Sequence, residues 1–372
     1  MRAMKKYPPS NKKAPFDKVP FNVGKPKLNV SKPKVKADAP ENSVAAPQNL
    51  PTQVSFALID EDQAGQRLDN FLMAKLKGVP KSKIYNIIRK GEVRVNKGRS
   101  QPDYKIAMGD EIRIPPVRMA EKDPLAKPSN VMTKLLEQSI VFENEGLLVI
   151  NKPPGLAVHG GSGVSLGLIE TLRQMRPEAR YLELIHRLDR DTSGCIMIAK
   201  KRSMLRHLQA ALREKSASGI RKIYQALVIG AWSTSVCRID APLLKTEVAN
   251  DERIVRVHAD GKPSLTEFKI LTSYEQCTLV EARPITGRTH QIRVHAQYAG
   301  HSLVGDEKYG DDEFNQSMRA LGVKRLFLHA AELGFYLPDS KELTIVKAPL
   351  AADLAAVLQK LTVINSSESK GV

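Results

Sequence analysis

A nine-residue stretch concentrates side chains that could do chemistry. The segment "HRLDRDTSG", residues 186–194, carries two aspartates and two arginines, and the apolar run "CIMIAK" follows it directly. A carboxylate that cations hold in place is a candidate nucleophile or general base. A solvated loop beside a buried strand has the same composition, so the rest of the chain must decide between these two interpretations.

A second polar segment offers a partner for one of these carboxylates. In "RPITGRTHQIRVH", residues 283–295, Thr289 is placed to cap a helix. Arg293 would then lie in the first turn, where its guanidinium could keep a nearby carboxylate ionised and oriented. Arg293 could equally form a purely structural ion pair. Spacing alone does not decide whether Asp189 or Asp191 is the reactive group.

Metal and nucleotide sites have no matching pattern in this chain. None of the eight histidines stands in an HExxH motif or in a zinc-type Cys/His spacing, and the three cysteines form no CxxC pair. The glycine-rich "HGGSG", residues 159–163, lacks the Gly-Lys-Ser/Thr ending of a P-loop. We therefore expect no metal and no cofactor.

Basic residues dominate the composition. Lys and Arg outnumber Asp and Glu by 58 to 40, which gives a formal net charge of +18 and favours nucleic acid as the partner over an anionic membrane. An apolar run of about 18 residues is missing, and the N-terminus lacks the apolar core of a secretory signal. Three sparse cysteines fit a reducing compartment. We expect a cytoplasmic protein with no membrane partner.

Composition divides the chain into four parts. Residues 1–53 are expected to be a disordered basic arm, since the first 50 residues hold eight of the 23 prolines and eleven Lys and Arg against three acidic residues. The arm could contact RNA phosphates or only keep the protein soluble. We place a compact module at residues 54–120, a linker at residues 121–138 and a larger domain at residues 139–372.

The compact module combines two helices with two strands. Leu68, Phe71, Leu72 and Leu76 mark one apolar helical face. The segment "VPKSKIYNIIRKG" predicts a second helix that Ser82 caps and Gly91 ends, and "EVRVN" and "GDEIRIPP" predict strands. Basic side chains surround the second helix and its exit, at positions Lys81, Lys83, Arg89, Lys90 and Arg94. They form either a solvated face or a surface for RNA phosphates.

The larger domain alternates short strands with helices. Strands are predicted within residues 140–155, 223–230, 277–285 and 343–350. Helices are predicted within residues 203–216, 289–300 and 351–361. This order indicates a mixed α+β domain.

At these motifs the chain resembles the RluA-type pseudouridine synthases. "HRLDRDTSG" is similar to the signature of that family, and "NKPPGLAVHGG", "KIYQALV", "GRTHQIRVHAQYAGHSLVGDEKYG" and "LFLHA" match its other motifs in the same order. Residues 66–116 resemble the S4 RNA-binding module that precedes the catalytic domain in many members. The resemblance implies an α+β fold: a catalytic domain with a mixed, mainly antiparallel β-sheet, preceded by a small S4-type α/β module.

The family likeness assigns roles to four residues. It implies that Asp189 is the nucleophile and that Arg293 pairs with it. It further implies that Arg187 enters the RNA stack in place of the flipped uridine, and that Tyr224 stacks on the base. Arg288 and His290 are expected to contact RNA.

The implied activity is isomerisation of uridine to pseudouridine, which requires no redox cofactor, metal or ATP. The expected partner is 23S ribosomal RNA or its precursor, and the enzyme is expected to be a monomer. Two alternatives stay open. One is a related synthase that acts on a different rRNA or tRNA site. The other is a non-catalytic S4-type RNA-binding or ribosome assembly factor.

Overall fold

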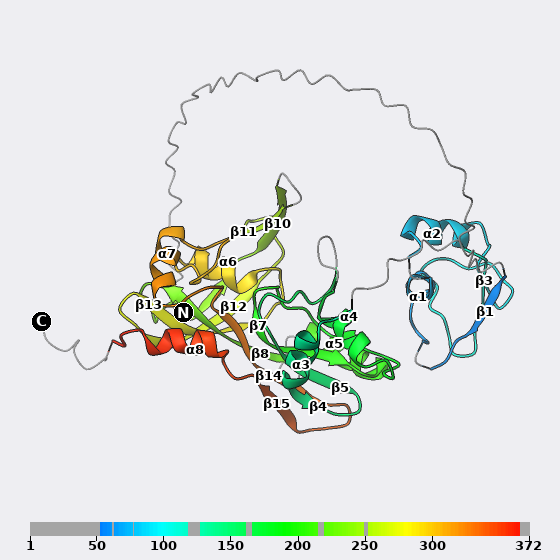
Figure 1. The fold of residues 1–372 in the computed structure, drawn as a ribbon. Helices are drawn as coiled ribbons and strands as arrows, with labels where there is room; N and C mark the ends of the chain where they lie inside the picture. The colour runs from blue at the N-terminus through cyan, green and yellow to red at the C-terminus, as the bar shows by residue number, and fades with distance from the viewer. Residues whose placement is uncertain are drawn as a thin grey trace, which may run out of the picture. The chain divides into compact units, whose positions relative to one another are not determined.

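The fold is taken from a computed structural model of the chain (Figure 1). The structure describes residues 53–364 apart from residues 62, 77, 118–126, 161–165, 215–218 and 249–251. The expected basic arm therefore lies outside the described residues except for Gln53, and so does the first third of the expected linker.

The front module is a three-stranded antiparallel sheet with two helices. The strands β1 (Ser55–Leu58), β2 (Arg94–Val95) and β3 (Glu111–Ile114) are arranged in the order β1-β3-β2. The helices are α1 (Leu68–Lys75) and α2 (Lys81–Arg89). Apolar residues at helical spacing, such as Leu68 with Leu72 and Ile84 with Ile88, bury their side chains in one shared core. Both predicted helices and both predicted strands are thus confirmed.

One predicted helix end in this module is right and the other is wrong. Gly91 follows α2 with a left-handed φ of +74°, a conformation that favours glycine and ends the helix as expected. Ser82 does not cap α2, because the helix already begins at Lys81 after Pro80. Ser82 therefore lies inside the first turn, two residues after the N-cap position, where its hydroxyl cannot cap the first free backbone N–H groups.

Ten of the described strands of the larger domain form one sheet, in the order β4-β5-β7-β14-β8-β13-β12-β9, with β6 paired to β7 and β15 to β14. Their bounds are β4 (Ile140–Glu143), β5 (Leu147–Lys152), β6 (Glu183–Leu184), β7 (Ser193–Ala199), β8 (Arg221–Ile229), β9 (Arg238–Asp240), β12 (Leu265–Ser273), β13 (Cys277–Pro284), β14 (Leu328–Tyr336) and β15 (Leu343–Lys347). The pairing of β7 with β14 is parallel, and the other pairings in this sheet are antiparallel. The expected mixed, mainly antiparallel sheet is confirmed.

A separate antiparallel hairpin, β10 (Leu243–Val248) and β11 (Glu252–Val257), follows β9 in the sequence. Two side chains of this hairpin, Leu243 and Val255, belong to an apolar cluster that also contains Val294 and Tyr309. The hairpin therefore helps to bury Val294 and Tyr309, which follow β13 in the sequence.

The sheet is covered by helices on both faces. Successive residues of β5 and β7 alternate between two apolar clusters, because side chains along a strand point to opposite faces. On one face, α3 (Asn130–Gln138), α4 (Leu168–Met175) and α6 (Gln291–Tyr298) contribute buried residues. On the other face, α5 (Arg202–Arg213), α7 (Asp312–Ala320) and α8 (Ala352–Gln359) do so.

Helix α3 lies inside the segment expected to be a linker. Ser129 caps it by accepting a hydrogen bond from the backbone N–H of Met132, and Leu136 is fully buried in the core of the larger domain. The Pro- and Lys-rich composition just before Ser129 is typical of a linker, so the sequence did not predict this helix. The last nine residues of the segment 121–138 therefore belong structurally to the larger domain.

Candidate active site

The polar segment "HRLDRDTSG" leads into strand β7, which pairs with two different strands along one of its edges. β7 pairs with β6 at Ile198 and Ala199 and with β14 at Ser193 and Gly194. Between these two pairings, Nε2 of His186 accepts a hydrogen bond from the backbone N–H of Met197 at 3.1 Å, in place of a strand carbonyl. Burial lowers the pKa of His186 to about 4, so the imidazole is neutral and suited to accept this hydrogen bond.

A buried lysine donates a hydrogen bond to the backbone of the same segment. The Nζ of Lys152, which is fully buried, donates three hydrogen bonds of 2.9 Å to the carbonyls of Pro153, Leu156 and Arg190. Burial lowers the pKa of Lys152 to about 7, against the opposing charges of two aspartates of the segment. Sequence reasoning missed this residue, although it lies in the motif "NKPPG".

Two cavities meet at Asp189. The first, of about 550 Å³, combines apolar residues such as Ile185, Tyr224 and Leu328 with basic ones such as Lys222 and Arg288. The second, of about 770 Å³, is lined by many basic side chains, including Arg190 and Lys324. The residues common to both cavities are Arg187, Leu188, Asp189, His290 and Arg293.

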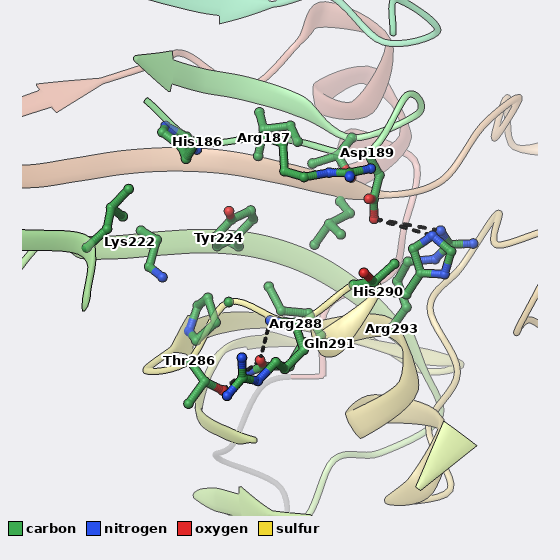
Figure 2. A pocket seen from close by; sticks show the side chains of 18 of the residues that line it. His186, Arg187, Asp189, Lys222, Tyr224, Thr286, Arg288, His290, Gln291 and Arg293 are labelled. Carbon is green, nitrogen blue, oxygen red and sulfur yellow. Dashed lines mark hydrogen bonds and ion pairs between the residues drawn. The ribbon is translucent and has the colours of Figure 1, made fainter. Parts of the chain in front are cut away.

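The carboxylate of Asp189 faces two nitrogen donors. Its Oδ2 lies 3.8 Å from Nε2 of His290 and 3.9 Å from Nη1 of Arg293, as the dashed lines in Figure 2 show. The Asp189 side chain is 23% exposed. Asp191 differs, since its side chain is 47% exposed and pairs with the neighbouring Arg190 at 3.2 Å. Geometry therefore favours Asp189 as the reactive carboxylate of the segment.

Arg293 lies beside Asp189 as expected, but its main partner is a different carboxylate. Its Nε and Nη2 donate to the two oxygens of Asp306, both at 2.6 Å, and Asp306 is fully buried. Burial opposes the charge of Arg293, yet Asp306 and then Asp189 outweigh it and raise the pKa of Arg293. Sequence analysis missed Asp306, whose signal was its place in the motif "VGDEKYG".

His290 and not Thr289 precedes helix α6. His290 has a left-handed backbone, with φ +52° and ψ +22°, and no side chain caps the helix. The expected cap by Thr289 is wrong, because the chain turns one residue later. Buried Gln291 fastens this turn by accepting the Oγ1–H of Thr286 at 2.7 Å and the backbone N–H of Arg288 at 3.0 Å. The turn thus presents His290 to Asp189.

Tyr224 lies on strand β8 and contacts the apolar clusters on either side of it. Burial raises the pKa of its hydroxyl, so the side chain stays neutral. Its ring lines the first cavity between Lys222 and Asp189 (Figure 2). In this position the Tyr224 ring can serve as a flat surface on which the ring of a ligand stacks.

Arg187 is exposed and lines both cavities. Its guanidinium has no hydrogen-bond or ion-pair partner in the part of the chain that the structure describes. Arg288 lies on the rim of the first cavity, where its Nε donates to the carbonyl of Pro263 at 3.2 Å. These two cations are therefore available at the mouth of the site.

The five basic residues of the front module that are predicted to contact RNA are all exposed. They are Lys81, Lys83, Arg89 and Lys90 around α2 and Arg94 on β2. Lys81 lies over the ring of Tyr85 at 5.7 Å, and the hydroxyl of Tyr85 donates to buried Asp69 at 2.7 Å. The structure thus places these cations on the module's surface, and their contact with RNA stays a prediction.

Neither a metal-binding cluster nor a membrane-spanning helix is present in the described ranges. No cluster of three or more His, Cys, Asp or Glu side chains is placed to hold a metal there. No helix in those ranges is long and apolar enough to cross a membrane.

The fold and site are those of an RNA-modifying isomerase with an added RNA-binding module. A family model described as RNA pseudouridylate synthase matches residues 146–298, and the S4 domain model matches residues 66–112. Among solved structures, Human RNA Pseudouridylate Synthase Domain Containing 4 is similar with a TM-score of 0.51 and 27% identity, over 62% of this chain and 95% of that one.

Curated relatives carry the likeness further. Ribosomal large subunit pseudouridine synthase C of Pasteurella multocida is 55% identical over 316 residues, which cover 84% of this chain and 96% of that protein. The protein of the same name in Escherichia coli is 55% identical over 83% of this chain and 97% of its own length. The chain belongs to the RNA pseudouridylate synthase family. The family resemblance predicted from the motifs is thus confirmed, and it extends to several proteins named ribosomal large subunit pseudouridine synthase C.

Proposed function

We propose that this isomerase converts specific uridines of 23S ribosomal RNA, or its precursor, to pseudouridine, with Asp189 as the nucleophile. The observation that carries the proposal is the place of Asp189 at the junction of two cavities that are both lined by basic side chains, the first of which also has several apolar residues in its wall. The relatives named ribosomal large subunit pseudouridine synthase C support the choice of RNA. Cytoplasmic location and a monomeric state stay predictions from the sequence.

The two cavities divide the substrate between them. A uridine inside an RNA stem must leave the stack before its glycosidic bond can be reached. The extruded uracil enters the first cavity and stacks on Tyr224, while the flanking phosphates lie against the basic second cavity. The ribose then lies at the junction, beside Asp189.

The reaction moves one bond from nitrogen to carbon. The bond between N1 and C1′ breaks, the bond between C5 and C1′ forms, and the proton on C5 is removed while N1 gains one. Asp189 either attacks C1′ or assists a glycal-like intermediate. Both routes need an ionised carboxylate that points in a fixed direction. The charge of Arg293 keeps Asp189 ionised and oriented, and Asp306 holds Arg293 in place through Nε and Nη2.

Arg187 compensates for the missing base. Its side chain is exposed at the mouth of both cavities and has no partner among the described residues. A planar guanidinium can enter the gap in the stack and interact with the neighbouring bases. Arg187 thereby stabilises the extruded state without contacting the reacting atoms.

The test is to incubate the purified protein with unmodified 23S rRNA and with unmodified tRNA, and to map pseudouridine in both. The proposal predicts new pseudouridines at a few positions of 23S rRNA and none in tRNA. Modification confined to tRNA would show the related synthase instead. Tight binding without any pseudouridine in any RNA would show a non-catalytic assembly factor.

A further inference from the structure

Two nitrogen atoms face the same oxygen of the Asp189 carboxylate, and both lie on the same side of it (Figure 2). Nε2 of His290 and Nη1 of Arg293 lie 3.8 and 3.9 Å from the same oxygen, Oδ2. Both distances exceed the roughly 2.7–3.2 Å of a direct N–H···O hydrogen bond. Both are short enough for a further oxygen atom to bridge Oδ2 and the nitrogen in question.

Arg293 presents a free N–H to the Asp189 carboxylate. Its Nε and Nη2 are both taken up by Asp306, so Nη1 is the nitrogen that remains for another acceptor. The guanidinium carries donors only. Its ring neighbour Tyr309, whose centroid lies 4.9 Å from the guanidinium carbon, helps to fix its direction.

The contact between Tyr309 and His290 favours one of the two positions of the proton on the His290 ring. The Tyr309 hydroxyl accepts the backbone N–H of Val255 at 3.0 Å and lies 2.7 Å from Nδ1 of His290. Its single proton is thus free to be donated to Nδ1, which then accepts and leaves the proton of the neutral ring on Nε2. The opposite tautomer would direct a lone pair of Nε2 at the carboxylate of Asp189.

Two donors and one acceptor are the complement of a hydroxyl group. A hydroxyl accepts two hydrogen bonds, here from His290 and Arg293, and donates one, here to Asp189. We propose that this triad binds the 2′-hydroxyl of the target ribose, with Tyr309 as the positioning residue that fixes the tautomer of His290. The proposal rests on the proposed function, which places C1′, the neighbour of C2′, beside Asp189.

The backbone of His290 supports this assignment. A non-glycine residue in the left-handed region is uncommon, and such strain gathers at functional sites. His290 is also nearly buried, with 17% of its side chain exposed, between the two cavities. The site would thereby recognise the group that distinguishes RNA from DNA.

The experiment compares two RNAs that differ only in the target nucleotide, which carries ribose in one and 2′-deoxyribose in the other. Single-turnover rates are measured for the wild type and for His290→Asn. Asparagine is well suited to the left-handed backbone, so the turn is kept while the imidazole is lost. Where the deoxy RNA reacts too slowly, the same comparison is made with the dissociation constants.

The proposal predicts that His290→Asn lowers the rate about tenfold on the ribose target. On the 2′-deoxy target, the rate should change by less than about twofold. An equal loss on both RNAs, or no loss on either, would overturn the proposal. An RNA with deoxyribose one nucleotide away from the target serves as the control and should behave like the all-ribose RNA. If the wild type makes no pseudouridine at all, the proposed function fails.

A second measurement does not depend on activity. The ¹⁵N chemical shifts of the His290 ring, identified by their loss in His290→Asn, report which nitrogen carries the proton. The proposal predicts a protonated Nε2 and an unprotonated Nδ1 in the wild type, and a mixture in Tyr309→Phe. A protonated Nδ1 with a bare Nε2 in the wild type would overturn it even for an active enzyme.

Discussion

At the scale of single residues, the centre of the site is an arginine held between two carboxylates of different burial. Asp306 is fully buried and takes up two nitrogens of Arg293, whereas Asp189 is partly exposed and faces the third. The asymmetry leaves Arg293 rigid and leaves Asp189 open to a substrate. It also means that Asp306 bears mainly on stability and Asp189 on chemistry.

Replacing Asp306 should therefore cost stability. Asp306→Asn leaves the charge of Arg293 buried without its counter-ion, and we expect the free energy of unfolding to fall by about 3–5 kcal/mol. Urea denaturation of the purified variant measures this. Asp353→Asn is the matched control, because Asp353 also pairs bidentately with an arginine but is 51% exposed, so its loss should stay below about 1 kcal/mol. Equal losses would contradict the central role of Asp306.

Arg187 should act in base extrusion. Its loss makes the extruded state less stable, and an unstructured RNA needs less unstacking than a stem does. We expect Arg187→Ala to slow single-turnover modification of a folded RNA more than that of an unfolded oligonucleotide with the same target. An equal fractional loss on the two RNAs would instead place Arg187 in the chemical step, holding Asp189 in position.

At the scale of elements, the turn into strand β7 requires a glycine. Gly194 has φ +107°, and a Cβ atom there would lie 2.2 Å from the carbonyl oxygen of Ala330 on β14. This contact is at the parallel pairing that anchors the end of the polar segment. The position of Asp189 thus depends on how closely two strand backbones approach each other.

Gly194→Ala should separate these strands. We expect it to lower the free energy of unfolding by at least about 3 kcal/mol, through strained backbone and overpacking together. Thermal or urea denaturation checks this. The control is Gly155→Ala, where φ is +77° but nothing lies within 4 Å of the added Cβ, so only the cost of about 1–2 kcal/mol for the backbone applies. A milder effect at Gly194 than at Gly155 would refute this account of the turn.

Five of the eight described helices and about half of the described strands could be predicted from local patterns, but their partners could not. The apolar periods of "LLVINK" and "IYNIIR" follow from which side of one element is buried, so they are visible in the sequence. The parallel pairing of β7 with β14 joins residues more than 130 positions apart and leaves no local trace. The start of α6 was wrong by one residue because Gln291, through long-range contacts, sets the turn.

The residues of the site divide in the same way. Asp189, Arg187, Tyr224 and Arg293 were predicted because family motifs mark them. Asp306 and Tyr309 were missed, although both lie in a quoted motif, because their importance comes from buried partners on other elements. Lys152 was missed for the same reason, since its role is to bond the carbonyl of a residue 38 positions away.

At the scale of the whole molecule, the front module should supply RNA affinity more than chemistry. Deletion of residues 1–120 removes the exposed cations of α2 together with the basic arm, so binding to long rRNA should weaken while activity on a short target RNA partly survives. Each lost phosphate contact should reduce the slope of log affinity against log salt by about 0.7–0.9.

The full-length protein with Lys83, Arg89 and Lys90 all changed to alanine separates the module from the arm. If the module contacts phosphates, this variant should lose about two to three units of the salt slope. Salt slopes equal to that of the wild type, for both the deletion and the triple variant, would show that neither part contacts phosphates.

The most direct test of the account is the activity of Asp189→Asn beside Asp191→Asn on the same rRNA. The amide of asparagine cannot act as an anionic nucleophile or base, so Asp189→Asn should form no pseudouridine while it still folds and binds RNA. Asp191→Asn should keep most of its activity, because Asp191 is half exposed and pairs only with the neighbouring Arg190. Substantial turnover by purified Asp189→Asn, or complete loss in Asp191→Asn alone, would contradict the assignment of Asp189 as the nucleophile.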